Sequence, residues 1–337
     1  MQKLFTRGAL FGLSLAIATP AVAHAASGDK YAIVFKNTGN PYGDRQMGGF
    51  KAGIEEQGFQ AILRAPDQPT AEAQIQILEQ LISQKVKAIC IVGNDRDALQ
   101  PVLTKAKKQG IKVFSLDSGV NPASRLTHVN QADSEKIGRT LVEAAYDMAG
   151  GSGEIAILSA TSQATNQNLW IEFMKKELAK PKFANLKLVK IAYGDDLRDK
   201  SVSEAEGLLQ SYPNLKVIIA PTTVGIAAAG KVLTDKGLGG KVFLTGLGLP
   251  SEMATYIENG VCPYMFLWNP IDVGYLGAYV ATALTSGKIT GAVGQKFKAG
   301  RLGEYTITKA PDGGTEVLLG PPFKFDKSNI ADWKTVY

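Results

Sequence analysis

The sequence predicts an α/β protein with two similar lobes, each built on a doubly wound parallel sheet, joined by a hinge that the chain crosses several times. Short apolar runs alternate with amphipathic helical segments, which is typical of parallel strands connected by helices. The 337 residues, 45% of them apolar, exceed the usual size of a single core and favour two lobes. The chain also repeats itself: KAICIVGN and IKVFSLDSG, at 87–94 and 111–119, return as KVIIAPTT and KVFLTGLGLP, at 216–223 and 241–250.

The first lobe is predicted to contain four strands, each an apolar run that ends at a polar or turn residue. Amphipathic stretches with glycine stops separate these runs. The expected strands are 31–35, 60–64, 88–92 and 111–116, and the expected helices are one that Gly58 ends, 71–84 and 97–109. This alternating order calls for a parallel sheet.

The same series restarts after residue 131 and predicts the second lobe. A helix behind Glu135 leads to strands expected at 154–158, 186–193, 217–220 and 242–246, with helices at about 169–178, after Asp199 and at 225–236. An apolar run at 261–268, a helix at 272–286 and a tail of short strands must be distributed over both lobes. We expect an N-terminal lobe of 28–130 plus 270–298 and a C-terminal lobe of 131–269 plus 299–337. A crevice between such lobes can close on a small molecule.

The N-terminus has the layout of a cleaved secretory signal peptide, expected at 1–25. Two basic residues precede an apolar stretch at 9–17, and small residues follow at Ala21, Ala23 and Ala25. The apolar stretch is too short to span a bilayer. No cysteine stands near the cleavage site, so we expect a periplasmic protein without a lipid anchor, and a monomer.

The two cysteines are predicted to be buried, reduced thiols. Cys90 falls inside an apolar run of the first lobe, whereas Cys262 is expected on a strand of the second. We therefore expect no disulfide, although the periplasm permits one.

The residues that most enzyme classes need are missing. His24 belongs to the signal peptide, which leaves His128 as the one histidine of the mature chain, and no Gly-x-Ser-x-Gly, His/Cys cluster or Walker loop occurs. The net charge of +6 is spread out, without a basic run interleaved with aromatic residues. We expect no enzymatic activity, no cofactor, no metal and no nucleic-acid partner.

Two weaker motifs do not change this expectation. The GLG at 246–248 resembles the start of a dinucleotide fingerprint, but Ser251 occupies the third glycine position. The acidic cluster at 195–199 lacks the alternating oxygen donors and the terminal Glu of a calcium loop. Helix capping before Ser201 explains that cluster better.

Hydrogen-bonding side chains gather at the expected strand ends, where open parallel sheets bind ligands. Asp117 stands out because the apolar run before it delivers its carboxylate to that edge. Polyols need such groups, since each hydroxyl both donates and accepts, and aromatic rings can cover the C–H face of a sugar. The candidate ligand-binding residues are Lys36, Asn37, Tyr42, Asp95, Asp117, Asn166, Gln167, Thr222, Thr223, Trp268 and Asn269.

Structural roles compete with ligand contact at several positions. Asp95 and Thr223 could cap the helices that follow them. Asp117, in Asp-Ser-Gly, could form an Asx turn, and Lys36 could pair with it as a structural bridge. Trp170 is expected in the core rather than against a ligand.

Over nearly all of the mature sequence the chain resembles type I periplasmic binding proteins of the ribose-binding class. The segments that most resemble rhamnose-binding proteins of ABC importers are LSATSQATNQNLWI, YGDDLRDKS, SYPNLKVIIAPTTVG, TGLGLPSEM and LWNPIDVGYL. The resemblance implies a hinge-closing binder that hands a sugar to a membrane permease and has no catalytic activity.

A neighbouring subfamily, similar over the whole length, binds the furanosyl signal autoinducer-2. Its pocket pattern of Lys, Asp, an Asp-Gln pair and Pro-x-Ala falls on Lys36, Asp117, 166–167 and 221–223. Asn166 replaces the acid and Thr223 replaces the alanine, which speaks against that signal. The ribose-binding pattern is also broken, because Ser118 and Gly248 stand where that pattern has an Arg and an acid.

The resemblance therefore favours the L-rhamnose-binding component of an ABC importer. Asp117 is expected to accept hydrogen bonds from ring hydroxyls, and Lys36 and Thr222 or Thr223 are expected to donate to the sugar. Asn166 and Gln167 would hold the sugar from the second lobe. Trp268 and Tyr42 would pack against the ring and its methyl group. An autoinducer-2 binder stays open as an alternative, as does a sugar sensor that docks on a chemoreceptor or histidine kinase.

Overall fold

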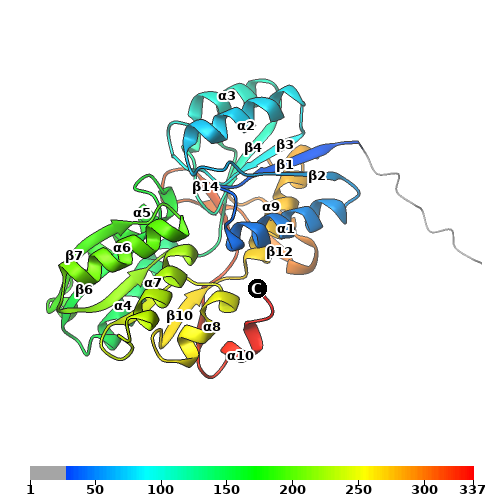
Figure 1. Ribbon diagram of the computed structural model, residues 1–337. Coiled ribbons are helices and arrows are strands. Elements are labelled where there is room, and N and C mark those ends of the chain that lie inside the picture. Colours follow the sequence, from blue (N-terminus) through cyan, green and yellow to red (C-terminus); the bar gives the residue numbers. More distant parts are fainter. Residues whose placement is uncertain (1–27) are drawn as a thin grey trace, which may run out of the picture.

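The computed structural model describes residues 28–337 and shows two α/β lobes (Figure 1). Within these residues the first lobe is built on a seven-stranded sheet in the order β13-β14-β5-β4-β3-β1-β2. Its strands are β1 (Lys30–Val34), β2 (Gln60–Arg64), β3 (Ala88–Ile91), β4 (Lys112–Leu116), β5 (His128–Asn130), β13 (Thr308–Lys309) and β14 (Thr315–Leu318). Its helices are α1 (Pro41–Glu55), α2 (Ala71–Ser83), α3 (Gln100–Lys108) and α9 (Pro270–Thr285).

Alternate residues of the first sheet pack on opposite faces, as a doubly wound sheet requires. Ile33 and Cys90 belong to the core cluster that includes Phe50 of α1 and Leu276 of α9. Their neighbours along the strands belong to a second cluster under α2 and α3, whose members include Ala32, Val34, Ile89, Ile91, Leu78 and Leu103. Both faces of the sheet are therefore buried, which explains why its strands are continuously apolar.

The second lobe repeats the arrangement of the first. In the described part of the chain it has a four-stranded parallel sheet in the order β7-β6-β8-β9. Its elements are α4 (Ser134–Met148), β6 (Gly153–Ser159), α5 (Thr165–Leu178), β7 (Leu186–Tyr193), α6 (Arg198–Ser211), β8 (Leu215–Ala220), α7 (Thr223–Asp235), β9 (Phe243–Gly246) and α8 (Pro250–Glu258).

The internal repeat read from the sequence corresponds to equivalent strand pairs. β3 pairs with β4 in the first lobe, and β8 pairs with β9 in the second, all in parallel. The order β2-β1-β3-β4 therefore matches β7-β6-β8-β9. This confirms the predicted fold class of two similar parallel-sheet lobes.

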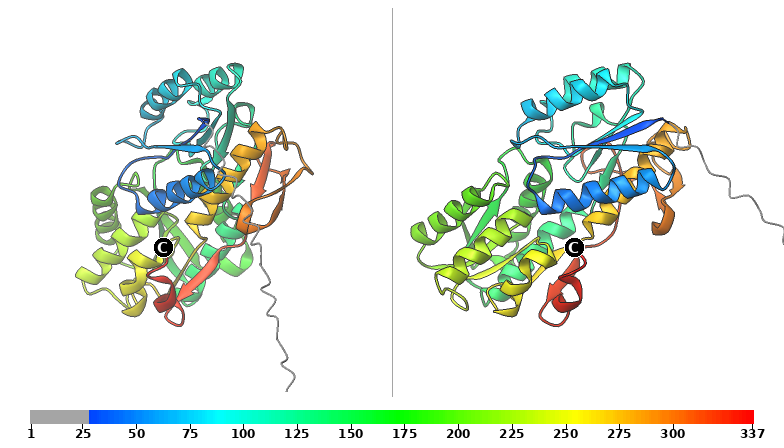
Figure 2. Two further views of the ribbon diagram at one scale, coloured as in Figure 1. Left: turned by 90° about the vertical axis from the view of Figure 1, so that its right-hand side faces the viewer. Right: turned by 45° about the vertical axis from the view of Figure 1, so that its right-hand side comes forward.

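The C-terminal tail differs from the expected division between the lobes. We expected 299–337 in the second lobe, but β14 pairs in parallel with β5 and extends the first sheet. Only the end of the tail joins the second lobe, where β15 (Phe323–Asp326) pairs with β10 (Tyr264–Leu267) and α10 (Ile330–Trp333) follows. Before β14, the strands β11 (Lys296–Lys298) and β12 (Glu304–Thr306) form a separate hairpin. Figure 2 shows this tail, orange to red, running from one lobe to the other. The unpaired edge of β5 explains the difference, because a strand edge needs hydrogen-bond partners.

Three further expectations concern export and the thiols. The signal peptide expected at 1–25 lies outside the described residues. None of the helices in 28–337 has the length and apolar character needed to cross a membrane. Cys90 and Cys262 are buried and free, as predicted, although Cys262 lies in the bend before β10 rather than on a strand.

Candidate ligand-binding site

A cavity of about 40 Å³ lies where the carboxyl ends of the two sheets face each other. We call it the central cavity. Eight of the eleven candidate residues line it: Lys36, Tyr42, Asp117, Asn166, Gln167, Thr222, Thr223 and Trp268.

Asp117 is held at the centre of this cavity by bonds from both lobes. It directly follows β4 and adopts a left-handed backbone, with φ of 62°, a conformation that Asp tolerates better than most residues. Its Oδ2 accepts from the Tyr42 hydroxyl and from Gln46 Nε2, the latter at 3.2 Å, and its Oδ1 accepts from Asn166 Nδ2 at 2.7 Å. The carboxylate oxygens are therefore engaged by other side chains rather than in an Asx turn.

Burial raises the pKa of Asp117, because the charged form loses its hydration, while the positive charge of Lys36 opposes the shift. Among the described residues these two groups form no ion pair, since Lys36 Nζ donates instead to Asn166 Oδ1 at 3.3 Å. Asn166 thus joins an ammonium and a carboxylate of the first lobe to the start of α5 in the second. The same atoms can exchange these bonds for the hydroxyls of a polyol.

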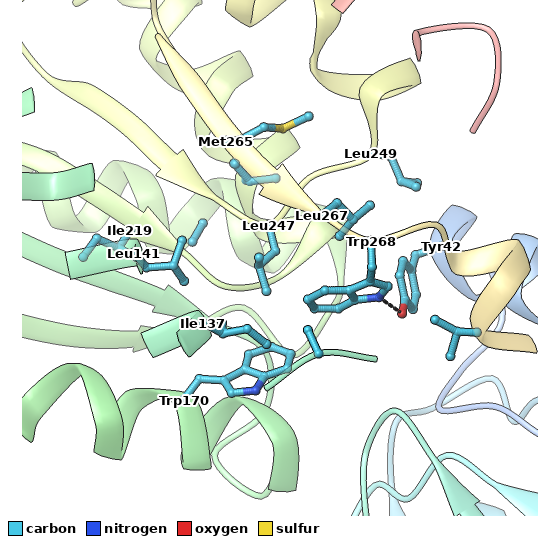
Figure 3. Packing of buried hydrophobic residues seen from close by; sticks show 14 of the residues in the cluster. Tyr42, Ile137, Leu141, Trp170, Ile219, Leu247, Leu249, Met265, Leu267 and Trp268 are labelled. Carbon is cyan, nitrogen blue, oxygen red and sulfur yellow. Dashed lines mark hydrogen bonds between the residues drawn. The ribbon is translucent and has the colours of Figure 1, made fainter. Parts of the chain in front are cut away.

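The aromatic wall of the cavity comes from both lobes (Figure 3). Trp268 follows β10, and its Nε1 donates to the Tyr42 hydroxyl at 2.7 Å. Trp170 meets Trp268 edge to face, with ring centroids 5.9 Å apart. Trp170 is buried, as expected for a core residue, yet it also lines the cavity. Together with Leu247 and Leu267 these rings make up the apolar part of the cavity lining.

Asp196 is a cavity residue that the sequence analysis missed. We attributed its cluster to helix capping, but the N-cap of α6 is Leu197, and no side chain caps that helix in the structure. Asp196 is buried, lines the cavity and accepts a hydrogen bond from Thr222. Its position just beyond the end of β7 was the available signal, because carboxyl ends of parallel strands carry ligand contacts.

Asn40 and Gln46 were also missed. Asn40 lines the cavity as the N-cap of α1, where its Oδ1 accepts from the amides of Tyr42 and Gly43. Gln46 lies one helical turn after Tyr42, so both reach Asp117 from the same face of α1. The spacing of Tyr42 and Gln46 could have indicated this pair.

Three candidate residues lie outside the central cavity. Asn37 is buried beside it, and Asn269 is the N-cap of α9, accepting from the Ile271 amide at 3.0 Å. Asp95 accepts from the amides of Asp97 and Ala98, both at 2.8 Å. It therefore has the capping role that competes with ligand contact at this position. At the other capping candidate, Thr222 rather than Thr223 is the N-cap of α7. The same Asn, Asp and Thr side chains can cap a helix or bind a ligand, so the sequence alone does not separate the two roles at these positions.

Replacing Tyr42 by Phe is expected to lower the stability of the folded protein. The change removes a donor from Asp117 and the acceptor of Trp268 Nε1, leaving buried polar atoms unpaired at about 1–3 kcal/mol. Urea unfolding should show that loss in the free energy of unfolding. Tyr305→Phe, on the β11–β12 hairpin outside the cavity, is the control, and equal stability of both variants would contradict the expectation.

His128 makes the stability of the protein sensitive to acid. It lies on β5 with Nδ1 2.8 Å from Ser115 Oγ, and burial, together with the charge of Arg125, lowers its pKa from 6.5 to about 3. Below pH 6.5 the unfolded chain binds a proton that the folded chain refuses, so stability is lost as the pH falls. We expect a loss of about 2 kcal/mol between pH 7 and pH 5 from this group.

Urea unfolding at the two pH values, on the wild type and on His128→Gln, measures this contribution. The difference between pH 7 and pH 5 should shrink by about 2 kcal/mol in the variant. An unchanged pH dependence would show that His128 is protonated in the folded protein.

The fold and the cavity define a class of protein. Two matching lobes, connected by several chain crossings and meeting over a polar cavity with an aromatic wall, form a binding protein that closes on a small ligand. Residues 31–289 match the family model described as a periplasmic binding protein domain. The chain belongs to this family.

Individual relatives agree with this assignment. A solute-binding protein of an ABC transporter from Clostridium phytofermentas, solved with bound L-rhamnose, is 52% identical, with a TM-score of 0.91 over 93% of this chain and 100% of that one. The D-allose-binding periplasmic protein of Escherichia coli is 26% identical over 84% of this chain and 91% of its own length. LsrB from Clostridium saccharobutylicum, solved in complex with AI-2, shares the fold, with a TM-score of 0.85 over 90% of this chain and 99% of its own, at 24% identity.

Proposed function

We propose that this protein captures L-rhamnose in the central cavity and delivers it to an ABC importer. The observation that carries the proposal is a cavity that combines polar groups from both lobes, joined by the bond between Asp117 and Asn166, with aromatic and apolar side chains. A 6-deoxy sugar has this same combination, with hydroxyls on one part and a methyl group on another. The relative with bound L-rhamnose supports the choice of sugar.

The cavity residues have roles that follow from their chemistry. Asp117 accepts from ring hydroxyls and Lys36 donates to a ring or hydroxyl oxygen. Asn166 and Gln167 contact the sugar from the second lobe, although Gln167 Oε1 already accepts from Ser159 Oγ and the Ala160 amide, both at 2.7 Å. Gln167 therefore offers its Nε2 as a donor. Further contacts come from Thr222, Thr223, Asp196, Tyr42 and Trp268, with Leu247 and Leu267 against the methyl group.

Calorimetry with a panel of sugars tests the proposal. We expect L-rhamnose to bind with micromolar or tighter affinity, which is about 8 kcal/mol or more. Fucose, ribose, xylose and autoinducer-2 should bind much more weakly. In a thermal-shift assay, L-rhamnose at a hundred times its Kd should stabilise the fold by about 2.7 kcal/mol. Tight binding of autoinducer-2 without binding of L-rhamnose would overturn the choice of ligand.

We further propose that the chain is exported to the periplasm through residues 1–25, acts as a monomer and has no enzymatic activity. The family assignment supports this placement. Uptake of labelled rhamnose should fail in a strain lacking the protein and return with the full-length gene. If uptake is normal but the response to rhamnose is lost, the protein acts as a sensor that docks on a chemoreceptor or kinase instead.

A further inference from the structure

A second cavity lies beside the central one and is lined by residues of α5 in the second lobe and of the strands β5 and β14 in the first. We call it the flank cavity. Its volume is about 390 Å³, against about 40 Å³ for the central cavity by the same measure. Nothing in the proposed capture of a monosaccharide uses this space.

The two cavities share one wall. Asp117 and Asn166 line both of them, and the hydrogen bond from Asn166 Nδ2 to Asp117 Oδ1 runs between the two spaces. Asp117 Oδ2 is held on the other side by Tyr42 and Gln46. A ligand in the central cavity that displaces the Asn166 bond therefore gains a route into the flank cavity.

The flank cavity is lined by hydrogen-bonding groups from both lobes. Asn130 is buried there and donates to Glu316 Oε2 at 2.9 Å, and His128 is buried beside it. From the second lobe comes Thr165, whose Oγ1 is buried without a hydrogen-bond partner among the described residues. A hydroxyl-rich group is what such a mixture of donors and acceptors can satisfy.

The charge of the lining selects against anions. Among the described residues it contains six carboxylates and two guanidinium groups, and one of those, on Arg125, is already paired with Asp312 at 2.7 Å. A phosphate or carboxylate entering this space would meet net negative charge. The lining thus disfavours an anionic occupant and admits a neutral one.

We infer that the flank cavity accepts a second sugar unit, so that the protein binds rhamnose-containing disaccharides as well as the free monosaccharide. One ring occupies the central cavity, the glycosidic oxygen passes between Asp117 and Asn166, and the neutral, hydroxylated second ring lies in the flank cavity. This inference rests on the proposed function of the central cavity and extends its range of ligands.

Calorimetry with three ligands tests the inference: L-rhamnose, a disaccharide with rhamnose at the non-reducing end, and one with rhamnose at the reducing end. Using both disaccharides covers either orientation of the first ring. We expect at least one disaccharide to bind within tenfold of L-rhamnose. Affinities of both disaccharides more than a thousandfold below that of L-rhamnose would overturn the inference and leave the proposed function intact. If L-rhamnose fails to bind, the function proposal fails, and the disaccharides alone then decide the inference.

Two variants locate the second ring. Leu169 and the exposed Glu172 lie on α5 and line the flank cavity but not the central one. Leu169→Trp and Glu172→Trp should each weaken disaccharide binding at least tenfold and change L-rhamnose binding less than twofold. Lys175→Trp, at an exposed position of α5 that lines neither cavity, is the matched control and should leave both affinities unchanged. Equal effects of the tryptophan variants on both ligands would place the second ring elsewhere and overturn the inference.

Discussion

Asp117→Ala is expected to abolish most of the affinity for the sugar. The substitution removes the acceptor at the centre of the cavity and leaves two ring hydroxyls without a partner, at about 1–3 kcal/mol each. The total of about 2–6 kcal/mol raises the Kd at least ~30-fold. Isothermal calorimetry with L-rhamnose measures this change directly.

A loss of binding at Asp117 is separable from a loss of folding. Because burial raises the pKa of Asp117, ionising this group costs more in the folded protein than in the unfolded chain, and its charge therefore lowers the stability at pH 7. Asp117→Asn keeps the shape and removes that charge, although its NH2 group faces one of the donors that now bond the carboxylate. It should bind poorly while still unfolding in urea in one cooperative transition. Asp235→Ala, at an exposed pair with Lys231, is the control and should leave the Kd unchanged. Full affinity in Asp117→Asn would mean that the carboxylate charge has no role in binding.

The fold could be predicted from the sequence because burial on both faces of a parallel sheet leaves a strong local signal. The buried strands β3 and β8 differ from expectation by one or two residues at an end, and the partly exposed edge strands β2 and β7 have the expected bounds. The place of β14 could not be read in this way. Its pairing with β5 depends on a contact between segments almost two hundred residues apart, and no local pattern states which edge a short strand will cover.

The site could be predicted where a side chain stands directly at a strand end, as at Asp117 and Lys36. Site residues were missed where tertiary packing brings the side chain to the site. Gln46 lies inside a helix, and apart from its spacing from Tyr42 only its bond to Asp117 defines it as a site residue. Asp196 looked like a helix cap in the sequence, and its contact with Thr222 joins two loops that the sequence keeps 26 positions apart.

Gly49→Ala is expected to have a large effect on stability, although it adds one methyl group. α1 and α9 pack side by side in the first lobe, and a Cβ at Gly49 would stand 2.0 Å from the backbone oxygen of Ile271. The obstacle is backbone at the start of α9, so one helix must move. We expect a cost of about 1–3 kcal/mol or more in the free energy of unfolding.

The neighbouring glycine of the same helix supplies the control. Gly48 is exposed, and a Cβ there meets nothing within 4 Å, so Gly48→Ala should stabilise the helix by about 0.5–1 kcal/mol. The two alanine variants therefore have opposite expected signs in the same urea experiment. Because α1 carries Tyr42 and Gln46 while Trp268 precedes α9, a displacement of the helices also moves the groups that hold Asp117. Gly49→Ala should consequently weaken sugar binding as well, whereas a Gly49→Ala variant as stable as Gly48→Ala would show that the contact between α1 and α9 does not position the site.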